Sequence, residues 1–235
     1  MVSLFLAAFD KTLLIPAVGI GGVAIYFAAK SLFGKRRAGL IESLAHKSGF
    51  TFRREGSTED EELLARSCLG IGRYNHTNNV MEPPSPDDMR MRVLDYAYSF
   101  KTGNYLDTAT QTVVHVQSPR LRLPSFLLRP ESSLAKLGQL MGAEDINFAD
   151  APQFNRMFLL RGENEAVMHI LFAPAVIAYC EQLHGISIGG AGDAFVVYRD
   201  RQLAAVNDLP ERLAEAKALA LRFVAASSQM TPLSA

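Results

Sequence analysis

Hydrophobic and polar positions divide the chain into an apolar N-terminal segment and a longer region of mixed character. Residues Thr12 to Ala29 include no charged side chain. With Lys30 to Phe33 added, this run reaches roughly the 20 residues that a helix needs to cross a bilayer core. The pattern predicts a transmembrane helix over 12–33, preceded by a short N-terminal segment, 1–11.

Two alternatives to a transmembrane helix are a buried core helix and a cleaved signal peptide. The length of the apolar run argues against a core helix. A signal peptide begins with positive charge, whereas the first ten residues contain no Lys or Arg. We therefore expect the run to cross a membrane.

Positive charge follows the apolar run and predicts the orientation of the chain. Before the run only Lys11 is basic, whereas Lys30, Lys35, Arg36 and Arg37 lie at its far edge. The positive-inside rule then predicts a single-pass protein of the inner (plasma) membrane, with the N-terminus outside and the C-terminal domain in the cytoplasm. These four basic residues are also the predicted membrane-surface contacts, with the lipid bilayer as partner, and 34–48 is the expected basic juxtamembrane segment and amphipathic helix.

Small residues form a stripe along the predicted transmembrane helix: Ala17, Gly21, Ala24 and Ala28. Such spacing lets a second helix approach closely. The stripe predicts self-association or docking to a membrane-protein partner, although Ala and Gly are also simply common in membrane helices.

Beyond the membrane segment, the patterns of strands and helices are segregated along the chain. A strand is expected at 50–55, and alternation over Met89–Phe100 predicts a hairpin with connection 101–110 and return strand 111–118. Further expected elements are an edge-like strand at 125–131, a helix from Ser132 or Ser133 to Gly142, strands at 146–149 and 156–162, helices at 163–172 and 174–185, a hairpin over 186–200, and a helix at 209–226 capped by Asp208.

This order of elements predicts the α+β class: one N-terminal transmembrane helix, then a mainly antiparallel sheet with packed helices. The expected soluble α+β domain covers 49–226, with two subdomains possible and a break near 131–145. A disordered tail is expected over 227–235.

Composition excludes broad nucleic-acid binding and narrows the possible chemistry. The chain has 24 basic and 24 acidic residues, so it lacks the basic excess of nucleic-acid-binding proteins. The two cysteines, Cys68 and Cys180, lie far apart in no metal-binding spacing, and Cys180 falls in an apolar helical pattern. The five histidines are scattered, so neither a metal site nor a cofactor is predicted.

Two further features were weighed as sites. The glycine-rich stretch Gly189–Asp193 lacks the Lys-Ser/Thr of a phosphate-binding loop and is interpreted as a hairpin turn. Asp95 and Arg129 each lie among apolar neighbours, and the sequence leaves open whether they form a buried pair or part of a site. No catalytic residue is predicted.

Several short stretches over 36–200 resemble a group of uncharacterised bacterial single-span membrane-anchored proteins. The resemblance implies one membrane span and a cytosolic α+β domain of unknown function, and implies no activity. The matching stretches are Asp95-Tyr96 with Tyr98, Leu123–Phe126, Arg129-Pro130-Glu131, Asp145–Phe148, Pro152, Phe154, Arg161-Gly162, Phe172 and Pro174.

The expected function is that of a membrane-anchored interaction or scaffold domain on the cytoplasmic face, without enzymatic activity. The alternatives are an enzyme of unrecognised type at the membrane surface and an exported domain released by signal cleavage. A cleft with converging polar groups favours the enzyme, and its absence favours the interaction domain.

Overall fold

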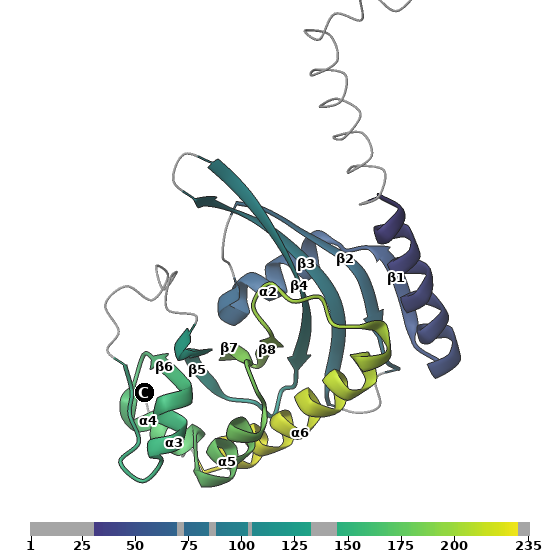
Figure 1. Ribbon diagram of the computed structural model, residues 1–235. Helices are drawn as coiled ribbons and strands as arrows, with labels where there is room; N and C mark the ends of the chain where they lie inside the picture. Colours follow the sequence, from purple (N-terminus) through teal and green to yellow (C-terminus); the bar gives the residue numbers. More distant parts are fainter. Residues whose placement is uncertain (1–30, 70–72, 85–87, 103–104, 133–144, 230–235) are drawn as a thin grey trace, which may run out of the picture. The chain divides into compact units, whose positions relative to one another are not determined.

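The computed structural model describes residues 31–69, 73–84, 88–102, 105–132 and 145–229 (Figure 1). Its compact unit, Ile41–Ala235, is built on one eight-stranded antiparallel sheet with strand order β1-β2-β3-β4-β8-β7-β5-β6. The strands are β1 (Thr51–Glu55), β2 (Arg73–Glu82), β3 (Arg90–Thr102), β4 (Tyr105–Gln117), β5 (Leu123–Pro130), β6 (Phe158–Gly162), β7 (Ser187–Gly192) and β8 (Ala194–Tyr198).

Short helices and one long helix accompany the sheet. They are α2 (Thr58–Leu64), the π-helical turn η1 (Ala65–Leu69), α3 (Pro152–Met157), α4 (Glu165–Leu171), α5 (Pro174–Gln182), the 3₁₀ turn η3 (Val206–Asp208) and α6 (Leu209–Ser227). A further helix covers residues 31–48. It ends at Gly49, whose φ of 69° is readily adopted only by glycine.

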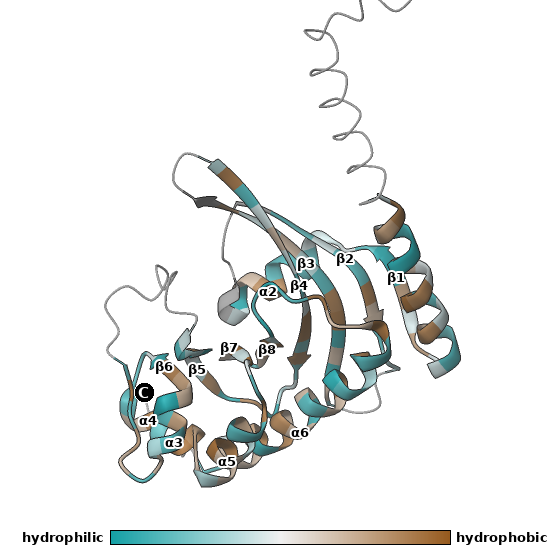
Figure 2. Ribbon diagram, viewed as in Figure 1, coloured by the Kyte–Doolittle hydropathy of each residue, from teal (hydrophilic) through white to brown (hydrophobic). Residues whose placement is uncertain are grey.

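The expected fold class needs a correction at its N-terminal end. An α+β arrangement with an antiparallel sheet forms, but no helix within the described ranges is long and apolar enough to cross a membrane. Polar and hydrophobic residues are mixed along the helix of residues 31–48 (Figure 2). Most of the expected span, 12–33, and the whole small-residue stripe lie outside the described residues.

The central hairpin is longer than its hydrophobic pattern predicts. β3 continues to Thr102 and β4 begins at Tyr105, so the expected connection over 101–110 is mostly paired strand. Near the tip the side chains are exposed, and Tyr105 keeps 81% of its surface. No core packs against this part of the hairpin, so its strands do not need apolar residues at alternate positions. Threonine and aromatic residues, which favour strands, occur there instead.

Three other predictions for the second half of the sheet were wrong. Residues 146–149, expected as a strand, form none. β5 was expected at an edge, but it lies between β6 and β7. Its prolines, Pro124 and Pro130, stand near its two ends, where a missing N–H costs little pairing. Residues 152–157, expected in part as strand, form α3 because Pro152 suits a first helical turn and Phe158 begins β6 instead.

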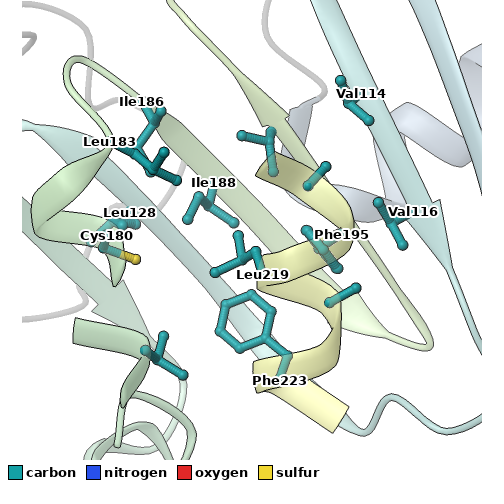
Figure 3. Packing of buried hydrophobic residues seen from close by; sticks show 14 of the residues in the cluster. Val114, Val116, Leu128, Cys180, Leu183, Ile186, Ile188, Phe195, Leu219 and Phe223 are labelled. Atoms are coloured by element: carbon teal, nitrogen blue, oxygen red, sulfur yellow. The ribbon is translucent and has the colours of Figure 1, made fainter. Parts of the chain in front are cut away.

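Helix α6 covers one face of the sheet and fills the main core (Figure 3). Phe223 reaches from α6 toward the sheet, with its ring centroid 5.3 Å from that of Phe195 and 5.8 Å from that of Phe126. Helical spacing predicts an inner stripe for this helix, and its residues are buried: Leu209, Leu213, Ala216, Ala220 and Phe223. The predicted cap, Asp208, makes no side-chain cap bond.

On the opposite face, α2 is attached to the sheet by buried charge. Asp60 is 1% exposed and accepts hydrogen bonds from Arg53 Nη2 at 2.9 Å and from the backbone N–H of Ser57 at 2.8 Å. Arg92, on β3, lies 3.4 Å from Asp60 and 3.3 Å from both Glu59 and Glu82. Burial raises the pKa of Asp60, but the bonds from Ser57 and Arg53 outweigh it, so the pKa lies below its usual value.

The charge pattern of the acidic run Glu59–Glu62 predicts a solvated loop or helix start, and the structure shows a helix start with one member, Asp60, buried. Ser57 and Asp60 form a capping box at the beginning of α2. The sequence predicts the helix start but not the ion cluster, because Arg92 comes from a distant strand.

We predict that F223A lowers the free energy of unfolding by about 3–5 kcal/mol, because it leaves a cavity among packed rings. Chemical denaturation measures the change. The control is L221A on the same helix, where Leu221 is 53% exposed and the loss should stay within about 0.5 kcal/mol. Equal losses in both variants would contradict the assigned packing.

We also predict that D60N costs about 3 kcal/mol in unfolding free energy, because it removes the buried charge that Arg53 and Arg92 share. The matched control is E62Q, which changes an exposed carboxylate on the same helix. If D60N were as stable as E62Q, the ion cluster would not hold α2 in place.

Candidate functional site

A hollow lies among α3, α4, α5 and the loop before α3. Its volume is about 690 Å³. Phe148 and Phe172 are buried at its apolar base, together with Ile177. Polar side chains lie around them: Asp150, Gln153, Arg156, His169 and Glu181. This combination of apolar surface with a few polar groups is typical of binding pockets, which commonly measure about 300–1,000 Å³.

Local sequence explains why the hollow has this shape. Asn155 on α3 fixes the preceding loop, since its side chain accepts a bond from Phe148 N at 3.0 Å and donates one to Phe148 O at 2.8 Å. Phe148 packs on Phe154 and on His169, at centroid distances of 5.6 and 4.6 Å. Pro174 begins α5 after Phe172, which keeps α4 and α5 apart as two helices.

The chemistry of the hollow is suited to binding. His169 lies 3.6 Å from Glu165 on the same exposed helix face. Within the described part of the chain, no three His, Cys, Asp or Glu side chains gather closely enough to hold a metal ion. Cys180 is a buried residue of α5, and burial raises the pKa of its thiol to about 12, so the reactive thiolate is not formed near neutral pH.

A second feature lies on the sheet face turned away from α6. Strand register places Arg129 of β5, Ser187 of β7 and Tyr198 of β8 side by side. Ser187 pairs with Tyr198, and Arg129 lies opposite Ser187, one residue beyond the Leu128–Ile188 pair. Their exposed fractions are 7%, 0% and 3%. Arg129 Nε, Ser187 Oγ and Tyr198 Oη have no hydrogen-bond partner of good geometry, and the Arg129 and Ser187 side chains lie close enough to act on the Tyr198 hydroxyl. We call these three residues the buried polar cluster.

The positive charge of the buried polar cluster is that of Arg129. No carboxylate forms a salt bridge with Arg129 in the described ranges. Burial raises the pKa of the Tyr198 hydroxyl, and the Asp200 carboxylate raises it further, whereas the nearby Arg129 guanidinium and Ser187 hydroxyl act to lower it. Tyr198 therefore stays protonated near neutral pH and can donate a hydrogen bond.

Asp95 and Arg129, weighed together in the sequence, do not meet. Asp95 accepts bonds from Asn79 Nδ2 at 2.9 Å and Thr112 Oγ1 at 3.0 Å on the α6 side of β3. Arg129 lies four strands away on the opposite face. Asp95 instead supports the neighbouring backbone, since Thr112 Oγ1 also accepts from Ala204 N.

The predicted membrane-surface residues are described only in part. Lys35 and Arg36 are exposed, Arg37 is buried, and Lys30 lies outside the described residues. The glycine-rich stretch forms a hairpin as expected, with Gly189 and Gly190 inside β7 and the turn at Gly192, whose φ is 63°. Ser187, Tyr198 and the residues of the hollow were missed, because only strand register and helix packing bring them together.

Together, these elements define an α+β domain that carries a hollow on one side of its sheet and a buried polar cluster on the other. No protein-family model and no curated protein matches the sequence. Among solved structures, the chain is similar to the mycobacterial trehalose monomycolate transport factor A, TtfA. The TM-score is 0.56 and the identity 11%, over 85% of this chain and 97% of the TtfA chain. At this identity the likeness shows a shared fold.

We predict that His115 makes stability pH-dependent. His115 is 2% exposed on β4, its Nε2 has no hydrogen-bond partner, and burial together with the Arg92 charge lowers its pKa from 6.5 to about 4. Between these two pKa values, His115 is therefore protonated in the unfolded chain and neutral in the folded chain. The stabilisation is complete above pH 6.5 and is lost as the pH falls toward 4, by about 3 kcal/mol in total.

Denaturation at several pH values checks this prediction. In H115Q, the difference in unfolding free energy between pH 6.5 and pH 4.5 should be much smaller than in the wild type. An unchanged pH dependence in H115Q would contradict the assignment.

Proposed function

We propose that this chain is a non-enzymatic interaction domain that works at a membrane surface and docks an apolar segment of a membrane-protein partner. The hollow among α3, α4 and α5 carries the proposal. It combines buried aromatic surface with charged side chains around it, as grooves that accept an amphipathic helix do.

A protein segment suits the hollow better than a small molecule. The hollow opens to solvent along α3 and α5, and Arg156 and Glu181 offer opposite charges near its apolar base. Apolar anchors then supply affinity, and the charges orient the bound segment.

The structural neighbour also supports a non-enzymatic role. TtfA is named a transport factor, which is compatible with a non-enzymatic role at a membrane for the present chain.

The helix of residues 31–48 supports the membrane location. Leu32, Phe33 and Leu40 are exposed, and Lys35 and Arg36 are exposed beside them. Exposed apolar side chains among basic ones favour contact with an anionic lipid surface, where apolar groups enter the headgroup region and the cations pair with phosphate.

The test is affinity purification of the full chain from detergent-solubilised membranes, quantified by mass spectrometry. A178R places a charged side chain in the hollow, and we expect it to reduce recovery of the main partner by about tenfold or more. The matched control is A225R, an exposed alanine of α6.

Equal recovery with A178R and A225R would contradict docking in the hollow. Absence of any partner in near-stoichiometric amount would contradict the interaction domain itself.

A further inference from the structure

We propose that Arg129, Ser187 and Tyr198 form a binding site for an oxyanion, the phosphate or carboxylate end of a ligand. The site goes beyond the proposed function, because it lies on the sheet face opposite α6 and uses none of the residues of the hollow.

Strand pairing supplies the geometry. β5, β7 and β8 are consecutive in the sheet, and Ser187 is the middle residue of the three. Neighbouring strands lie about 4.8 Å apart, so the three side chains project from one face in a short row. A rigid sheet interior fixes their positions better than a loop does.

Charge is the strongest argument for a ligand. The other buried arginine of this face, Arg92, is surrounded by Glu59, Asp60 and Glu82. Arg161, on the next strand, pairs with Asp145 at 2.7 Å. Arg129 is the exception, since it is 7% exposed and pairs with no carboxylate within the described ranges. A buried guanidinium without a counter-charge is strongly unfavourable, so a bound anion is the natural compensation.

The free polar atoms define the class of ligand. Arg129 Nε can only donate a hydrogen bond, and the hydroxyls of Ser187 and Tyr198 can donate as well. Three donors side by side, one of them positively charged, favour an acceptor that carries several lone pairs and negative charge. Phosphate and carboxylate groups meet both conditions.

The covering element limits what can bind. The π-helical turn η1 packs on β5, β7 and β8. Such turns occur often at functional sites, and the low exposure of Arg129 restricts the site to a small terminal group.

Thermal unfolding of the full chain tests the proposal. Inorganic phosphate and acetate are titrated separately against sodium chloride at matched ionic strength. We expect phosphate, acetate or both to raise the Tm by several degrees more than chloride does. The comparison of the two anions shows which group the site prefers.

Variants assign the effect to the cluster. R129M should abolish the anion-dependent shift, and Y198F, which keeps the buried ring, should reduce it. R161M is the matched control on the neighbouring strand and should keep the shift while losing its ion pair with Asp145. In chloride alone, R129M should melt above the wild type by a few degrees, because it removes an unpaired buried charge.

Three results would overturn the proposal: an anion shift no larger than that of chloride, a shift that persists in R129M, or an R129M protein that melts below the wild type in chloride. These outcomes are independent of the partner recovery that tests the hollow.

Discussion

The constraint on which the structure depends is the burial of both faces of one antiparallel sheet. Side chains alternate between the faces, so each strand must satisfy two environments at once. One face receives α6 and is filled by aliphatic and aromatic side chains. The other receives α2 and η1 and holds Arg92, His115 and Arg129. A register slip of one residue would turn these polar groups into the apolar core, so the ion pairs and the strand register support each other.

The two faces of the sheet also carry different features. Helices α3 to α5 lie on the α6 side and form the hollow, which is suited to an apolar segment. On the other side the ionic side chains largely hold structure: Arg92 is fixed by three carboxylates, and Tyr98 donates to Asp200 at 3.1 Å. Against that background an arginine without a counter-charge indicates a role beyond stability, because its burial is costly to keep.

Sequence reasoning succeeded where local pattern decides structure. The alternation of β3 and the buried stripe of α6 follow directly from period-two and helical spacing. It failed where distant contacts decide. The hairpin extends past its apolar core through Tyr105, and β5 is interior because β6 pairs beside it. For the span expected at 12–33, no helix in the described ranges is long and apolar enough to cross a membrane.

The candidate sites show the same division. An arginine within the apolar strand Leu123–Pro130 was a visible signal, and it was noted beside Asp95. Ser187 and Tyr198, its actual neighbours, could not be found from sequence, because residues 58 and 69 positions further along the chain join it only through strand register. The hollow was likewise invisible, since it depends on how three short helices pack.

The most direct test of this account is a crystal structure of the protein grown with selenate, located by the anomalous scattering of selenium. The account predicts a peak within hydrogen-bond distance of Arg129 Nε, Ser187 Oγ and Tyr198 Oη. A guanidinium of Arg129 paired with a carboxylate of the chain, with no anion beside it, would contradict the account.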